Sequence, residues 1–236
     1  MGDRYWLWVG ARLLIAVAIV GWAASYLGSG SGEKEFQKTL DAMKQVHSFR
    51  AALVATPYTQ RNEMLWEVDC GRNFVHHQEH FTNRCSGDSP ACQNVDMTRE
   101  ELDWAVYEYE RQSDGSWAAS RHPAGNQTKY LCGHLADGTD SNLLPPIATM
   151  IRRGIIQKGD KKTVNGVRCR EWLVTMKGAP SGLEHDTICL GLADRLPYEW
   201  TVDWENSRAS FSDYNATIPF DLPAEVVKAT NTSASN

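Results

Sequence analysis

Apolar residues recur along this chain at two different spacings, one after the other. Phe36 and Met43 belong to a run spaced three or four positions apart, which is the period of an α-helix with one buried face. A few residues later the spacing becomes two, because Phe49 and Leu53 alternate with more polar neighbours. The pattern therefore predicts a helix over 33–47 and then a β-strand.

Alternation returns through most of the remaining chain. Further strands are predicted over 64–70, 73–81, 105–110, 167–176, 185–192, 198–205, 208–214 and 218–222. A short helix is predicted between Asn142 and Gly154 with two prolines in its first turn, and Thr98 to Glu101 match a capping box for one more helical turn. This order of elements predicts an α+β, mainly β fold, in which a curved antiparallel sheet has helices covering its concave face.

The first residues have a different character from the rest. Arg4 and Arg12 precede or flank an apolar run over 13–27, an order that places the N-terminus in the cytoplasm and directs the downstream residues to export. The run is shorter than the roughly 20 residues that cross a bilayer, so both a cleaved signal peptide and an uncleaved transmembrane anchor stay open. We expect a signal peptide or anchor over 1–28, a Gly/Ser linker over 29–32, one domain over 33–225 and a disordered tail over 226–236.

All six cysteines lie downstream of this segment, and an even number behind an export signal indicates disulfides. Cys169 and Cys189 flank a turn almost symmetrically, which predicts a bridge across a hairpin. Among the 15 connectivities that six cysteines allow, the turn-rich segment between Cys85 and Cys92 favours that pair. Cys70 with Cys132 then remains by elimination.

Charge and motifs argue against several functions. The net charge of −5 is spread without blocks, so no basic stripe for nucleic acid is present. No G-x-S-x-G elbow occurs. His76, Glu79 and His80 match the H-x-x-E-H pattern of zinc peptidases, but that chemistry requires a helix and the flanking residues predict a strand. We therefore expect no enzymatic activity, no cofactor and no metal, with the zinc peptidase kept as the remotest alternative.

Three segments resemble the LolA, LppX and RseB-like superfamily of periplasmic lipid carriers and envelope sensors. They run over 163–172, over 187–197 and over 211–219, and the resemblance extends from about Glu33 to Ala224. It implies an unclosed half β-barrel whose concave face, plugged by helices, holds acyl chains, and it implies a periplasmic location. The chain departs from many relatives because it has no lipidated N-terminal cysteine and because its cysteines are paired. The resemblance carries no catalytic residues.

Aromatic side chains are the candidate lining of a ligand cavity between helices and sheet. The residues assigned to it are Met43, Trp66, Trp104, Trp172, Trp200 and Trp204. Ordinary core packing of a half-barrel would use the same residues. The sequence thus predicts an extracytoplasmic, non-enzymatic module that binds a hydrophobic ligand, such as lipid or lipoprotein acyl chains, and contacts the membrane through its N-terminal segment. The alternative is an envelope sensor that binds another envelope protein through the same scaffold.

Overall fold

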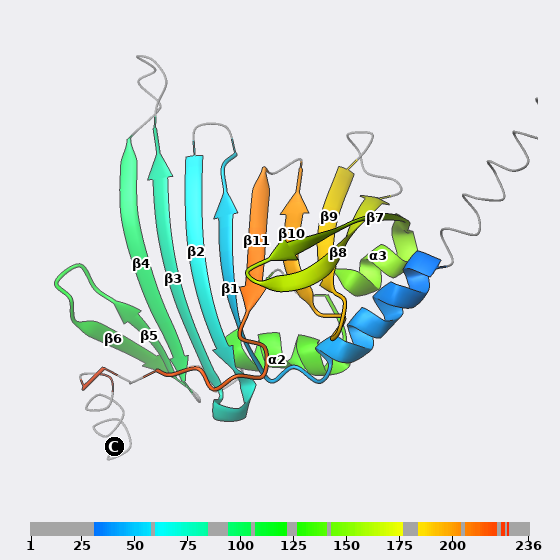
Figure 1. The fold of residues 1–236 in the computed structure, drawn as a ribbon. Helices are drawn as coiled ribbons and strands as arrows, with labels where there is room; N and C mark the ends of the chain where they lie inside the picture. Colours follow the sequence, from blue (N-terminus) through cyan, green and yellow to red (C-terminus); the bar gives the residue numbers. More distant parts are fainter. Residues whose placement is uncertain are drawn as a thin grey trace, which may run out of the picture.

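One large antiparallel sheet dominates the molecule (Figure 1). The computed structural model describes residues 31–57, 60–84, 94–104, 107–121, 127–140, 143–176, 184–203, 206–220, 223–224 and 226. Within them the sheet has 11 strands in the order β6-β5-β4-β3-β2-β1-β11-β10-β9-β8-β7. The N-terminal segment 1–28, the Cys85–Cys92 pair and Trp204 lie outside the described residues.

Each strand pairs with neighbours that are close in sequence, except where β1 meets β11. The strands are β1 (Ser48–Ala55), β2 (Gln60–Asp69), β3 (Phe74–Asn83), β4 (Val95–Trp104), β5 (Tyr107–Arg111), β6 (Trp117–Arg121), β7 (Gly154–Val164), β8 (Val167–Met176), β9 (Glu184–Gly191), β10 (Pro197–Val202) and β11 (Ser207–Ser212). The β1–β11 pairing joins the first strand of the chain to the last and so unites the two halves of the sheet.

The strand registers assign the residues to two faces. Trp66 lies opposite Ala51 on β1 and opposite His77 on β3, and Ala51 also lies opposite Phe211 on β11. Directly paired residues point to the same face, and Ala51 and Phe211 are fully buried. These residues therefore mark the concave face, which is covered by helices.

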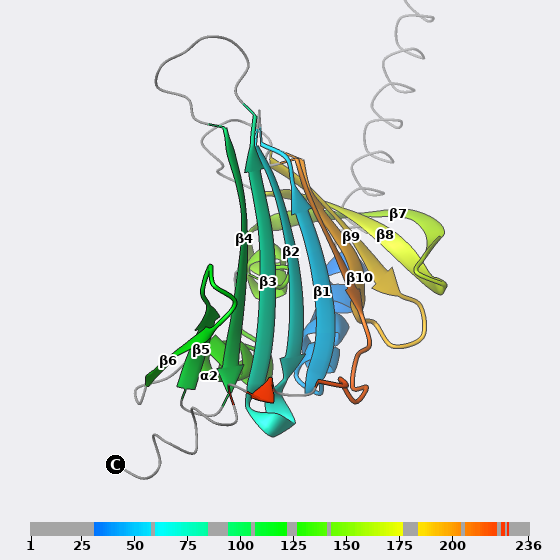
Figure 2. The same cartoon turned by 90° about the vertical axis from the view of Figure 1, so that its left-hand side faces the viewer.

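Helices pack on this concave face, as the side view in Figure 2 also shows. They are the helix over 31–43, α2 (Gln127–Asp137) and α3 (Ile147–Arg153). Their apolar side chains share one core cluster with the sheet, including Phe36, Met43, Leu131, Leu135, Ile147 and Met150 from the helices and Phe49, Val68, Val75, Val174, Ile188 and Phe211 from the strands. The predicted fold class, a curved antiparallel sheet with helices on its concave face, is confirmed.

Several local predictions were wrong. Thr98 to Glu101 lie in β4, where every residue pairs with β3, so cross-strand pairing overrides the capping-box pattern. Helix α2 was not predicted at all. Residues 218–220 do not form the expected strand, and the helix over 31–43 already includes two residues that the sequence analysis assigned to the linker.

Two disulfides are present among the described cysteines. Cys169 pairs with Cys189 across β8 and β9, and Cys70 pairs with Cys132, so both predictions are confirmed. The second bridge ties α2 to the short 3₁₀ helix η1 (Cys70–Arg72) after β2. Among the described helices, none combines the length and the apolar character needed to cross a membrane.

The convex face carries a smaller core of its own. Phe74, Leu102 and Tyr109 are buried there together with Val226, which the sequence analysis placed in the tail. The segment after β11 reaches this cluster by crossing the strand ends, where Phe220 packs 4.6 Å from the ring of Phe74. The chain thus covers its sheet on both sides.

Candidate functional site

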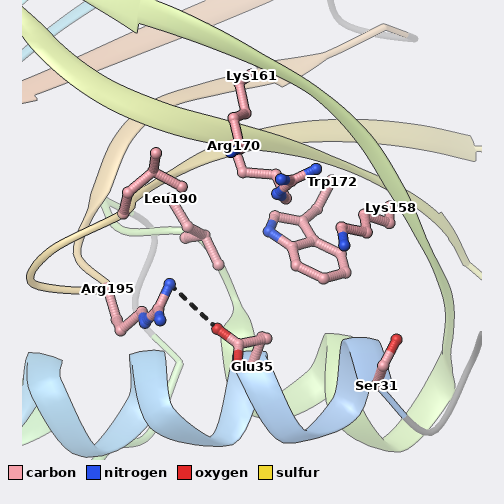
Figure 3. A pocket seen from close by; sticks show the side chains of 9 residues that line it. Ser31, Glu35, Lys158, Lys161, Arg170, Trp172, Leu190 and Arg195 are labelled. Atoms are coloured by element: carbon pink, nitrogen blue, oxygen red, sulfur yellow. Dashed lines mark ion pairs between the residues drawn. The ribbon is translucent and has the colours of Figure 1, made fainter.

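A pocket of about 360 Å³ opens between the β7–β8 hairpin, the helix over 31–43 and the turn after β9 (Figure 3). The pocket combines an apolar wall with several cations. Its lining residues are Ser31, Glu35, Lys158, Lys161, Arg170, Trp172, Leu190, Leu192 and Arg195. An amphipathic lining of this kind can bind a ligand that has both an apolar and a charged part.

A bulge in β7 directs two lysines into the pocket. Lys158 pairs with Trp172 and Lys161 pairs with Arg170, so β7 advances three residues while β8 advances two. In a regular strand, residues three apart point to opposite faces, but the extra residue of a bulge brings both lysines to one face. Gly159 occupies the bulge, where an added Cβ would lie 3.2 Å from Cβ of Glu171.

The two arginines of the pocket are held by further contacts. Arg170 donates from Nη1 to the carbonyl of Gly159 at 3.0 Å, which fixes its side chain against the bulge. Arg195 lies across the pocket and pairs with Glu35 at 3.3 Å (Figure 3). The hydrogen bond from Lys38 lowers the pKa of Glu35. Partial burial opposes this shift and the charge of Arg195 adds to it, so that the pKa lies below its ordinary value. Glu35 is therefore ionised at neutral pH.

The structure brings together four of the six residues predicted to line a ligand cavity. Met43 and Trp172 are buried in the main core, and Trp66 and Trp200 pack against it while partly exposed. Trp66 also stacks on His77, with ring centroids 3.8 Å apart. These four side chains therefore lie on the helix-covered side of the sheet.

Trp104 lies elsewhere. It pairs with Phe74 and packs against the small cluster on the convex face. Since the register alternates along β4, its side chain points away from the helices. Trp204 lies outside the described residues.

Among the described residues, the helices leave little space between one another. A pocket between the helix over 31–43, α2 and α3 measures only about 10 Å³, which is about the space that one water molecule needs. Its walls include Leu40, Met43, Leu135, Leu144 and Ile147. An acyl chain could enter here only if the helices moved away from the sheet.

The histidine motif does not form a metal site. His76, Glu79 and His80 lie in strand β3 rather than on a helix, which contradicts the zinc-peptidase alternative. Glu79 also points to the opposite face from the two histidines, because its position differs by an odd number of residues. In the part of the chain that the structure describes, no three His, Cys, Asp or Glu side chains are grouped to hold a metal ion.

His76 instead joins a row of charged side chains on the convex face. Its Nδ1 lies 3.0 Å from Glu67 and its Nε2 lies 3.0 Å from Glu100. Arg50 pairs with Glu67 at 2.7 Å, and Arg111 pairs with Glu100 at 2.8 Å. A row of polar contacts through Arg50, Glu67, His76, Glu100 and Arg111 thus runs across five adjacent strands, from β1 to β5.

The cationic pocket was not predicted from the sequence. The signal available was the density of basic residues in the β7–β8 hairpin, which includes Lys158, Lys161, Lys162, Arg168 and Arg170. Alternation alone predicts that Lys158 and Lys161 point to opposite faces of the strand. The bulge brings them to the same face, and the sequence pattern did not indicate it.

No protein-family model matches this chain, and no curated protein matches it. Among solved structures it is similar to the Pseudomonas aeruginosa MucA/MucB complex, with 13% identity and a TM-score of 0.41 over 83% of this chain and 62% of that one. It is also similar to a crystal structure of MucB, with 15% identity and a TM-score of 0.42 over 84% of this chain and 65% of that one. The LolA superfamily protein NE2245 from Nitrosomonas europaea gives 10% identity and a TM-score of 0.27, over 83% and 96% of the two chains.

The chain spans less than two thirds of the length of these MucB chains. At these identities and scores the similarities assign neither a family nor a function to this chain.

Proposed function

We propose that this chain is an extracytoplasmic, non-enzymatic module that binds a hydrophobic ligand between its helices and the concave face of its sheet. Its first 28 residues would direct export and either anchor the module to the membrane or be removed. The two disulfides support this location, because such bridges persist in oxidising compartments outside the cytoplasm.

The observation that carries the proposal is the nature of the helix–sheet interface. Met43, Leu135, Ile147 and Met150 face a sheet surface of comparable apolar character. Such contacts are not directional, so an acyl chain can replace helix side chains at little cost in specific interactions. Each CH₂ group buried in this way contributes about 0.8 kcal/mol.

The helix layer is also attached in a way that permits displacement. Helix α2 is tied to the sheet end by the Cys70–Cys132 bridge, and α3 continues directly into β7. Each helix therefore has one fixed point, which is the middle of α2 at Cys132 and the C-terminal end of α3. Separation from the sheet would be a rotation about these points, with chain connectivity maintained.

A photoactivatable acyl probe tests the proposal. The full chain would be incubated with a diazirine-bearing palmitic acid, irradiated and analysed by mass spectrometry for the position of each adduct. We expect adducts on concave-face residues such as Trp66, Trp200 and Leu135, and we expect unlabelled palmitate to compete for them. Trp104 and Tyr109 on the convex face provide the internal control.

Adducts restricted to the convex face or to residues 1–28, or labelling that palmitate fails to reduce, would contradict the proposal. The sensor function, in which the same scaffold binds an envelope protein, would then be the better account.

A further inference from the structure

The pocket beside the β7–β8 hairpin has an excess of positive charge in a chain that is negative overall. Four cations line it and Glu35 is the carboxylate among its lining residues, whereas the whole chain has a net charge of −5. The neighbouring Lys162, on the other face of the sheet, is balanced by carboxylates. It pairs with Glu171 at 2.6 Å and with Glu199 at 2.5 Å. The pocket cations thus outnumber the carboxylate that could neutralise them.

These cations come from separate elements and converge on one space. Lys158 and Lys161 lie on β7, Arg170 lies on β8 and Arg195 lies in the turn after β9. Figure 3 shows Lys158 and Arg170 beside the indole of Trp172, with Arg195 on the opposite side next to Glu35. Guanidinium groups form paired hydrogen bonds with phosphate oxygens, and lysine ammonium groups add charge without a fixed direction.

The same pocket borders the main apolar core. Trp172 and Leu190 line the pocket and also belong to the core cluster. Trp172 is 4% exposed and packs edge to face on Phe36 of the helix over 31–43, with ring centroids 6.0 Å apart. A ligand whose anionic group sits among the cations would therefore have its apolar part directed at the junction of helix and sheet.

From this geometry we infer that the pocket binds a phosphate group, carried by an amphipathic ligand whose apolar chain enters at Trp172. The inference rests on the proposed function and specifies the headgroup of the ligand. A phosphate could come from a lipid or from solution, and the cations would recognise the same chemistry in both.

Calorimetric titration of the full chain in phosphatidylcholine nanodiscs tests the inference, with empty nanodiscs subtracted. The titrants are dihexanoyl phosphatidic acid, dihexanoyl phosphatidylcholine and inorganic phosphate. We expect phosphatidic acid to bind most tightly and its affinity to fall as salt is raised, because the contacts are ionic. In the double variant K158Q/K161Q its affinity should fall at least about tenfold, since two of the four cations are lost.

The control is the double variant K44Q/R61Q, which removes the same charge from exposed positions outside the pocket. It should bind phosphatidic acid as the unchanged protein does. Equal binding of both lipids, with no effect of K158Q/K161Q, would overturn the phosphate inference and leave hydrophobic binding intact. Binding of inorganic phosphate as tightly as phosphatidic acid, weakened by K158Q/K161Q, would support the pocket as an anion site and count against the lipid function. Absence of binding by all three titrants would contradict both.

Discussion

At the scale of single residues, His76 is a buried polar side chain that lies between two carboxylates. His76 is 6% exposed and contacts carboxylates at both ring nitrogens. The His76 ring thus links the Arg50–Glu67 pair to the Glu100–Arg111 pair.

Replacing His76 by leucine should destabilise the fold by about 2 kcal/mol, because two largely buried carboxylates lose the group between them. Urea unfolding at pH 7 measures the change. His80 provides the control, since it lies on the same face of the same strand, is 45% exposed and contacts the exposed Asp96. H80L should change stability by less than about 0.5 kcal/mol. If H76L and H80L lost similar amounts of stability, the contacts of His76 with Glu67 and Glu100 would not be the cause of the loss.

The stability that Glu199 contributes to the fold should depend on pH. Burial alone would raise its pKa, but hydrogen bonds from Lys162 and Arg208 lower the pKa below the ordinary 4.5. A carboxylate with a lowered folded-state pKa contributes stability that is complete above its unfolded pKa. That contribution is lost as pH falls through the folded-state value.

The variant E199Q should therefore be less stable than the unchanged protein by about 2 kcal/mol at pH 7. The difference should shrink as the pH is lowered below 4.5. Denaturant unfolding from pH 7 to pH 3 tests this, with E63Q as the control because the Glu63 side chain is 42% exposed. A difference that stays constant over the whole range would rule out ionisation of Glu199 as its cause.

At the scale of elements, the sequence predicted most of the strands, but it missed strand β7 and helix α2. The alternation of Tyr198, Trp200 and Val202 with Glu199 and Thr201 in β10 is the pattern expected of a sheet with one face against a core. Helix α2 was not predicted because it has few buried positions, chiefly Thr128, Leu131 and Leu135. Polar residues and Gly133 separate these positions in the sequence. Tertiary contacts and the Cys70–Cys132 bridge stabilise this helix, and neither is visible in local periodicity.

The candidate site, too, was predicted only in part from the sequence. Residue types predicted that Trp66, Trp172 and Trp200 pack against the core, but the face of Trp104 depends on the register of β4 with β3. The bulge between Lys158 and Lys161 depends on how β7 pairs with β8. Both are properties of strand pairing, so the spacing along one strand does not contain them.

The Cys70–Cys132 bridge should control the protection of α2. It closes a separation of 62 residues, and a loop of that length is worth about 4 kcal/mol in the chain-entropy model. In the double variant C70A/C132A we expect amides of 127–137 to exchange faster with deuterium, while those of α3 change less. The variant C169A/C189A is the matched control and should leave α2 protected. Equal acceleration in both variants would indicate global destabilisation rather than release of the helix.

At the scale of the whole molecule, the two halves of the sheet are joined by β1 and β11 and by the segment after β11. In that segment, the carbonyl of Ala216 accepts a hydrogen bond from Ser48 and the carbonyl of Ile218 accepts one from Arg72. Phe220 then covers Phe74 and His76, at centroid distances of 4.6 Å and 5.0 Å. The segment therefore fastens the C-terminal half of the chain across the outer side of strands from the N-terminal half.

Truncation after residue 215 should for this reason destabilise the whole sheet, although it removes no strand. The loss of Ile218, Phe220 and Val226 exposes apolar surface worth about 5 kcal/mol, at roughly 1.5–3 kcal/mol for each buried side chain. Thermal unfolding should shift to lower temperature, and an anilinonaphthalene dye should bind the exposed convex cluster. Truncation after residue 226 retains these three side chains and should leave both measurements unchanged. If truncation after residue 226 also lowered the unfolding temperature, residues beyond 226 would contribute to the fastening; if neither truncation did, β1–β11 pairing alone would hold the two halves together.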